Sequence, residues 1–280
     1  MAGGGAGVAV KIARVFPTKT SMCPNDPDAY FGLPGFFTPQ YDEIHISVTF
    51  TWDIKKTEQL AREWEKFGKV KIGGVAIDGE SDKPFVAGMY LRKGITITSR
   101  GCLNSCDFCM VRRGLIEFND FPEGNIIQDN NILACSNRHW RSVMTMLKKQ
   151  KNIEFKGGLE KYRITPKIAE DLRSLKIKTL WLACDEPKGL KALKKAVEIL
   201  QKAGFTRNYL YCYCLIGKDI NEEELRLREI WNIGCMPFAQ LYRNKNDDIK
   251  YSWQFRRFAR AWSKPAIIRT RAKYNWLKCQ

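Results

Sequence analysis

Three cysteines in the segment 101–110 carry the clearest chemical signal in the chain. Cys102, Cys106 and Cys109 are spaced at i, i+4 and i+7, so on one near-helical turn their side chains point to the same side. A short loop with this spacing can direct three sulfur atoms at one point. Three thiolates without an evident fourth partner suit a cubane iron–sulfur cluster in which one iron keeps an open position.

Two other uses of these cysteines are less favoured. Structural zinc needs four ligands, usually as two spaced pairs. The chain has no second Cys-x2-Cys pair, and its only histidines are His45 and His139. A disulfide would leave an odd cysteine among three that lie within eight residues. A zinc site and three incidental thiols therefore stay open as alternatives to the iron–sulfur site.

An aromatic residue, Phe108, directly precedes the last of the three cysteines. The pattern Cys-x3-Cys-x2-Cys with this aromatic residue resembles the hallmark of the radical S-adenosylmethionine (radical SAM) superfamily, and all four positions match it. The resemblance implies a [4Fe–4S] cluster held by the cysteines, with SAM chelated at the open iron. It further implies reductive cleavage of SAM to a 5′-deoxyadenosyl radical, with an electron from a donor such as a flavodoxin or ferredoxin. The cofactors would supply the chemistry and the protein their position.

Composition limits the cell compartment and the partners. The 280 residues are 44% hydrophobic and contain no run of about 18 apolar residues, which predicts a soluble, cytoplasmic protein without a membrane partner. Ten cysteines favour a reducing compartment. The net charge of +17 favours nucleic acid or another polyanion. The same charge could also serve solubility or attract an acidic electron donor.

From Gly94 onward, strand-like and helix-like segments alternate in units of roughly 30 residues, as βα repeats do. Six such units fit the partial (βα)6 TIM-like barrel that the radical SAM resemblance implies, and we assign residues 94–248 to it. The three cysteines follow the first strand, and the carboxyl ends of barrel strands are where active sites lie. The expected strands span 94–99, 125–133, 153–156, 179–183, 209–216 and 236–242.

Helices should lie between these strands. One is expected over 137–150, and a second starts with Thr165 as N-cap and Pro166 as N1. A third ends at Gly204. A fourth starts with a capping-box-like pair, Asn221 and Glu224, and ends at Gly234.

Residues 1–93 are expected to form a small α/β region before the barrel. It should contain a strand over 44–50, a helix over 55–67, a strand over 70–72 and a loop over 16–38. The strand–helix–strand fragment resembles the tail of a cobalamin-binding domain. However, the segment is too short and lacks the Asp-x-His-x-x-Gly motif, so cobalamin is not expected.

Residues 249–280 form a basic and aromatic extension, because no acidic residue follows Asp248. We expect a helical extension that packs on the barrel through its aromatic side chains. Its basic side chains either remain solvated or contact phosphates. The alternative for its aromatic rings is that nucleic-acid bases stack on them.

Polar groups at the expected strand ends are the candidates for binding SAM. Asp129 and Asn130 follow the second strand, and Asp129 is either a ligand or a turn-forming residue. Gly157 and Gly158 follow the third strand and either let the backbone approach SAM or make a tight turn. Phe108, Arg163 and Gly217 are the remaining candidates. Arg163 could pair with the SAM carboxylate or remain exposed to solvent. Gly217 resembles the residue at the end of the fifth strand that contacts adenine in radical SAM enzymes.

Cys184 and Asp185 end the fourth strand and are the candidate catalytic residues. Cys184 could donate a hydrogen atom or hold a second cluster, with a buried hydrophobic role as the favoured alternative. Asp185 could bind ribose or substrate, or cap the following helix.

Three functions remain after these observations. The first is a radical SAM enzyme that acts on nucleic acid or a nucleotide, and the second is the same enzyme with a peptide or small metabolite. The third is a non-catalytic, metal-stabilised nucleic-acid-binding protein. Neither the bond formed nor the fate of SAM follows from the sequence.

Overall fold

The computed structural model describes residues 10–276 except 112, 245, 247 and 248. The chain divides into two compact units, residues 1–93 and residues 94–280. Within the described ranges, no helix is both long enough and apolar enough to cross a membrane.

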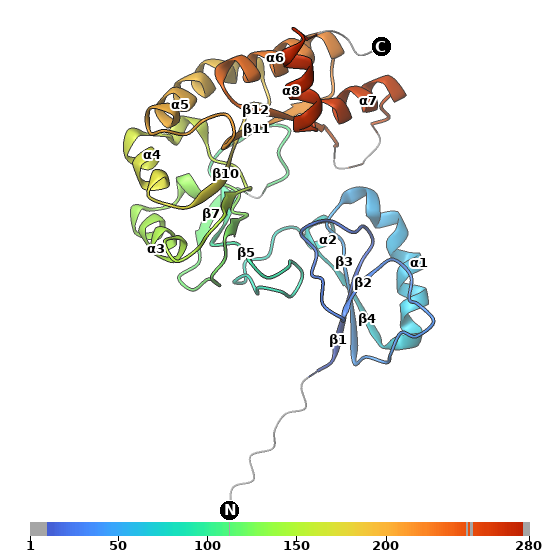
Figure 1. Ribbon diagram of the computed structural model, residues 1–280. Coiled ribbons are helices and arrows are strands. Elements are labelled where there is room, and N and C mark those ends of the chain that lie inside the picture. Colours follow the sequence, from blue (N-terminus) through green and yellow to red (C-terminus); the bar gives the residue numbers. More distant parts are fainter. Residues whose placement is uncertain (1–9, 112, 245, 247–248, 277–280) are drawn as a thin grey trace, which may run out of the picture. The chain divides into compact units, whose positions relative to one another are not determined.

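The first unit is a four-stranded parallel sheet with strand order β2-β1-β3-β4 (Figure 1). Alternating residues of β3, Ile44 and Ile46, are buried beside Trp64, whose indole nitrogen donates to the Gly32 carbonyl at 3.0 Å. The predicted α/β character is confirmed. The structure adds two strands that the sequence did not predict, one of them inside the expected loop over 16–38. The elements are β1 (Ile12–Phe16), β2 (Ala29–Phe31), β3 (Glu43–Ser47), α1 (Ile54–Trp64), β4 (Lys69–Gly73) and α2 (Val75–Asp78).

The second unit contains six parallel strands in the order β12-β11-β10-β9-β8-β5, so strands that are consecutive around the sheet follow one another in sequence. Among the described residues, β5 and β12 are its edges. A mixed α/β fold with parallel sheets is therefore confirmed, whereas closure into a TIM-like barrel stays a prediction. The strands are β5 (Ile95–Thr96), β8 (Ile126–Ile127), β9 (Ile153–Phe155), β10 (Ile177–Ala183), β11 (Leu210–Ile216) and β12 (Met236–Leu241).

Four helices connect these strands and follow one another along one side of the sheet (Figure 1). Their apolar stripes enter the main core, as at Val143, Leu172 and Val197. Thr165 caps its helix as predicted, accepting from the Ile168 amide at 3.3 Å. The predicted N-cap near Asn221 is wrong, because the Asp219 side chain accepts from the first-turn amides instead. The helices are α3 (Asn137–Leu147), α4 (Pro166–Arg173), α5 (Leu190–Lys202) and α6 (Ile220–Ile233).

A pair of short antiparallel strands, β6 (Ser99–Cys102) and β7 (Gly114–Glu117), was not predicted. It follows β5 directly and carries the three cysteines of the 101–110 segment. The second strand of the predicted set is much shorter than expected, since β8 ends at Ile127 and Ile132–Ala134 is a 3-10 turn.

The C-terminal extension forms α7 (Trp253–Ala261) and α8 (Pro265–Lys273). Trp262 is fully buried between them in the main core, and its carbonyl accepts from the Ala239 amide of β12 at 3.1 Å. The extension therefore packs on the sheet unit through its aromatic residues.

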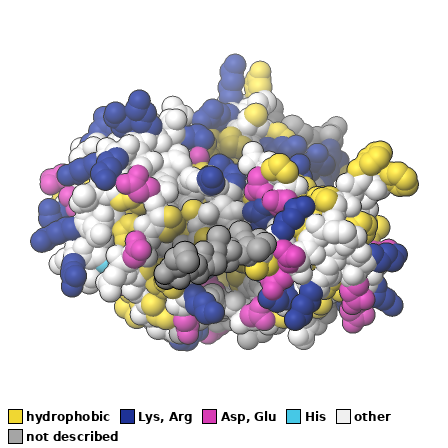
Figure 2. Space-filling view, turned by 90° about the horizontal axis from the view of Figure 1, so that it is seen from below, with side chains coloured by type: hydrophobic (Ala, Val, Ile, Leu, Met, Phe, Trp, Pro, Cys, Tyr) yellow, Lys and Arg dark blue, Asp and Glu magenta, His cyan; other side chains and the backbone are white. Residues whose placement is uncertain are grey.

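Figure 2 shows Lys and Arg side chains spread around the displayed face with Asp and Glu side chains between them, so this face is not uniformly basic.

Candidate active site

The β6–β7 pair presents the cysteine loop. Cys102 is the last residue of β6 and is paired with Gly114, and the Cys109 amide donates to the Cys106 carbonyl at 3.1 Å within the loop. All three thiols are free, with Cys102 half-buried and the other two exposed. The antiparallel ladder thus fixes the first sulfur and leaves the other two on an accessible loop.

The Cys106 thiol is affected by burial and by the two neighbouring thiols. Partial burial raises the pKa of the Cys106 thiol, and the neighbouring Cys109 and Cys102 thiols raise it further. Nevertheless, no group of three or more metal-binding side chains is arranged to hold an ion in the part of the chain that the structure describes. A cysteine site need not be preformed before metal binds, because metal binding and local folding are coupled. Three free thiols on one loop fit an iron–sulfur cluster by donor type.

Three consecutive residues after β8 hold the base of this loop. The Asp129 carboxylate accepts from the Thr98 amide at 2.8 Å, the Thr98 hydroxyl at 2.6 Å and the Ser99 hydroxyl at 2.7 Å. Asn130 Oδ1 accepts from the Gly101 amide at 2.9 Å, and Asn131 Nδ2 donates to Cys102 Sγ at 3.4 Å. Asp129, Asn130 and Asn131 therefore bind successive positions of the chain that leads to the first cysteine.

Asp129 has little surface left for a ligand. Only 1% of it is exposed, and burial raises the pKa of its carboxyl, with hydrogen bonds from Thr98 and Ser99 opposing that effect. The predicted role of Asp129 as a direct SAM contact is thus disfavoured by its burial. In the structure, Asp129 positions the chain that leads to Cys102. The sequence had offered a structural role for Asp129 only as a turn-forming residue.

Asn131 and Glu160 form the polar centre beside Cys102, and the sequence did not mark either as a site residue. Asn131 Nδ2 donates to Glu160 Oε2 at 2.7 Å, and Arg163 Nε donates to the same oxygen at 2.8 Å. Burial opposes ionisation of Glu160, yet hydrogen bonds from Asn131, Asn104 and Arg163 hold its pKa below the ordinary value. Asn131 Oδ1 is buried and has no hydrogen-bond partner among the described residues.

The unpartnered Asn131 Oδ1 bears on whether these residues fit the amino-acid part of SAM. A buried acceptor without a donor costs free energy, which a bound donor would recover. Asn131 Oδ1 and the Glu160 carboxylate together offer acceptors for an ammonium group next to the cysteine loop. They therefore fit the amino group that SAM carries.

The predicted glycines after β9 differ in what they do. A Cβ on Gly157 would lie 1.9 Å from the Asp129 carbonyl oxygen, so Gly157 is required where two backbone segments meet. Gly158 has a φ of +100°, and a Cβ there would meet no atom within 4 Å. Gly157 thus permits a close approach to the backbone of Asp129 and not to a ligand. This contact holds the Asp129 segment in place.

A hollow of about 550 Å³ lies between the cysteine loop and the carboxyl ends of β10 and β11, and Phe108, Asp185 and Gly217 line it. Its volume is within the range of small-molecule sites. A second hollow of about 320 Å³ is lined by Cys106, Glu160 and other residues, and it shares Phe108 and Asp185 with the first. The structure therefore brings five predicted or newly found site residues to one region.

Asp185 and Cys184 are neighbours with different environments. One carboxylate oxygen of Asp185 accepts from the Leu215 amide at 2.9 Å, and burial raises the pKa of this carboxyl. Cys184 is fully buried in the main core beneath Gly189, and burial raises the pKa of its thiol. The structure disfavours the catalytic role of Cys184, since its thiol is packed in the core, and keeps Asp185 as a hollow-lining residue.

Gly217 and Lys161 also shape the region around the two hollows. A Cβ on Gly217 would lie 2.6 Å from the Tyr251 hydroxyl, so this glycine leaves room for a ring from the C-terminal extension. Lys161 Nζ donates to the Ala183 carbonyl at 3.1 Å, and its charge acts on Cys106 and Asp185. The sequence did not single out Lys161, although it directly follows the Gly-Gly-Leu-Glu segment.

No protein-family model and no curated protein matches this chain.

Proposed function

We propose that this protein is a radical SAM enzyme with residues 94–248 as a partial (βα)6 barrel. The observation that carries the proposal is the placement of Cys102, Cys106 and Cys109 on one loop beside an accessible hollow at the carboxyl edge of six parallel strands. That edge is where ligands bind in parallel α/β sheets. Phe108, the aromatic residue of the cysteine motif, lines both hollows beside the cysteine loop.

When bound and reduced by an external one-electron donor, a [4Fe–4S] cluster would supply the electron for cleavage of SAM to methionine and a 5′-deoxyadenosyl radical, which would take hydrogen from a substrate. The three cysteine sulfurs would hold it, with Asn131 fixing the position of Cys102 Sγ. Asn131 Oδ1 and Glu160 would accept from the SAM amino group. Asp185 has one carboxylate oxygen without a protein donor among the described residues and would accept from ribose hydroxyls.

Arg163 is exposed and already donates one nitrogen to Glu160. Its remaining nitrogens are available for the SAM carboxylate, because a guanidinium carries five N–H donors. Lys161 adds positive charge near the Cys106 thiol and would favour its thiolate form. These roles make the chain's own contribution one of binding and orientation.

The substrate proposal is a nucleic acid or a nucleotide, supported by the net charge of +17. A reducing cytoplasm and a small acidic electron donor such as a flavodoxin or ferredoxin fit the same charge and the free thiols.

The test is anaerobic purification and reconstitution with iron and sulfide, followed by dithionite and SAM. We expect 5′-deoxyadenosine from the wild type and none above background from Cys106→Ala. Cys23→Ala is the matched control, because Cys23 is a free cysteine of the first unit. Wild-type protein that takes up the cluster and yet releases no 5′-deoxyadenosine would exclude the enzyme and leave the metal-stabilised binding protein.

A further inference from the structure

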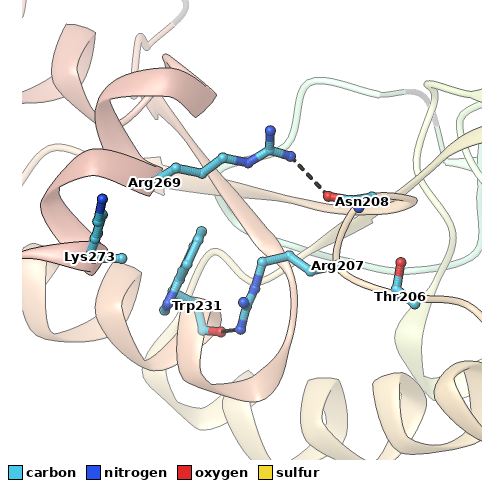
Figure 3. A pocket seen from close by; sticks show the side chains of 7 residues that line it. Thr206, Arg207, Asn208, Trp231, Arg269 and Lys273 are labelled. Carbon is cyan, nitrogen blue, oxygen red and sulfur yellow. Dashed lines mark hydrogen bonds between the residues drawn. The ribbon is translucent and has the colours of Figure 1, made fainter.

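A third hollow, of about 550 Å³, lies at the opposite end of the sheet from the candidate active site. Thr206, Arg207 and Asn208 precede β11, whereas Gly217 follows it, so the hollow is at the amino end of β11. Trp231 of α6 and Arg269 and Lys273 of α8 complete it (Figure 3). The residues of the candidate active site play no part in it.

Three cations surround this hollow. Arg269 and Lys273 are four residues apart on α8, so they share one helix face. Figure 3 shows Arg207 approaching from the loop before β11, across Trp231 from Lys273. Burial lowers the pKa of Arg207, and the charge of Arg269 lowers it further, which places the two guanidinium groups within electrostatic reach.

Among the described residues, no carboxylate neutralises these cations. None of the residues lining the hollow is acidic, and the described residues form no ion pair with Arg207, Arg269 or Lys273. Adjacent arginines differ, because Arg228 and Arg271 both pair with Glu224, at 3.0 and 2.5 Å. Because the paired Arg271 and the unpaired Arg269 lie two residues apart on α8, we infer that the hollow keeps its positive charge.

The protein holds two of the cations in place through neutral partners. Arg269 Nη2 donates to Asn208 Oδ1 at 3.0 Å, and Arg207 Nη2 donates to the Trp231 carbonyl at 2.8 Å (Figure 3). The Arg207 guanidinium also lies 4.0 Å from the centroid of the Trp231 ring. Arg207 Nε is buried and has no hydrogen-bond partner among the described residues. Positioned donors without an acceptor are what an anion site requires.

We propose that this hollow binds a phosphate group, carried by a nucleotide or by a polynucleotide chain. Two guanidinium forks and one ammonium match the charge and the several oxygens of phosphate better than they match a single carboxylate. The Arg207 guanidinium lies over the Trp231 ring, and the Trp276 ring packs against Trp231 nearly at a right angle, with centroids 5.8 Å apart, so Trp231 supports the cation. The site goes beyond the proposed radical chemistry and needs neither cluster nor SAM.

Calorimetric titration of the full-length chain with pyrophosphate at constant ionic strength tests the site. We expect Arg269→Gln and Lys273→Gln each to weaken pyrophosphate binding about tenfold, the size of one lost charge-assisted hydrogen bond. Arg207→Lys keeps the charge and loses the fork, so a smaller loss is expected. Arg260→Gln on α7 is the control, because it removes the same charge at an exposed position outside the hollow.

A parallel titration with a short single-stranded oligonucleotide separates the sources of the phosphate. Weaker oligonucleotide binding and a lower salt dependence in Arg269→Gln, compared with Arg260→Gln, would assign the site to a polynucleotide. Loss of pyrophosphate binding alone would assign it to a free nucleotide. Pyrophosphate that does not bind the wild type, or binds all variants alike, would overturn the proposal. Production of 5′-deoxyadenosine without substrate should be unchanged in Arg269→Gln, so this proposal and the proposed function can fail separately.

Discussion

The two ends of the second unit's sheet use charged and polar side chains in opposite ways. At the carboxyl end, Asp129, Asn130, Asn131 and Glu160 bond to the protein itself and fix the cysteine loop. At the amino end, Arg207, Arg269 and Lys273 lack any acidic partner among the described residues. The first arrangement places a loop for a cofactor, whereas the second preserves charge for a ligand. Substitutions at the first end should therefore change stability, and those at the second should change binding.

The largest effect is expected for Asp129→Ala. Three donors, one amide and two hydroxyls, would lose their acceptor in a buried site. The free energy of unfolding should fall by about 3 kcal/mol, since each buried unsatisfied group costs about 1–3 kcal/mol. Urea denaturation measures this change, with exposed Asp120→Ala as the control. Equal stability of the two variants would show that the Asp129 bonds do not hold the loop base.

Gly157→Ala should be the next most destabilising change. Its Cβ would lie 1.9 Å from the Asp129 carbonyl oxygen, so the backbone of one segment must shift. A loss of about 2 kcal/mol is expected, typical of overpacking in a dense region. Gly35→Ala, where the Cβ would meet only Thr38 Oγ1 at 3.9 Å, provides the comparison. Thermal unfolding followed by circular dichroism can rank the two, and a Gly157 variant as stable as the Gly35 variant would contradict the close contact.

Glu160→Gln should alter the pH dependence of stability. The folded-state pKa of Glu160 lies below its ordinary value of 4.5, so its ionised form stabilises the folded state at pH values above about 4.5. That contribution is lost as the pH falls through the folded-state pKa. The variant should therefore be less stable than wild type at neutral pH and show a shallower loss of stability on acidification from about pH 5 to about pH 3. Exposed Glu198→Gln should follow the wild-type curve, and identical curves for all three proteins would argue against the Asn131–Glu160–Arg163 bonds.

The smallest effect on stability is expected for Arg269→Gln at the amino end. Arg269 is exposed and has one neutral hydrogen-bond partner, so the free energy of unfolding should change by less than about 0.5 kcal/mol. Urea denaturation of this variant, beside Asp129→Ala, completes the contrast between the two ends. A loss comparable to that of Asp129→Ala would mean that the amino-end cations are structural and would remove the distinction.

The sequence predicts those parts of the fold that have long periodic patterns. β10, β11 and β12 carry apolar runs, and the N-cap Thr165 and the terminal Gly204 and Gly234 mark helix ends by local chemistry. The β6–β7 pair escapes prediction, because Ser-Arg-Gly-Cys has no alternating apolar pattern and is held by side-chain bonds from Asp129 and Asn130.

The site was predictable where its residues form a local motif or follow an expected strand end, as Asp185 and Gly217 do. The three cysteines with Phe108 form a local motif, but Asn131 and Glu160 meet across 29 residues, from the ends of different strands. Arg269 and Asn208 are 61 residues apart, so only the folded chain places them at one hollow. The burial of Cys184 was likewise a tertiary outcome, because a strand end can face either the core or the hollow.

The most direct test of the proposed cluster is the iron and acid-labile sulfide content of anaerobically purified and reconstituted protein. We expect about four of each per chain in the wild type and a loss of most of both in Cys106→Ala, with Cys23→Ala unchanged. Bound zinc, or no metal at all, in the wild type would contradict an iron–sulfur site at Cys102, Cys106 and Cys109.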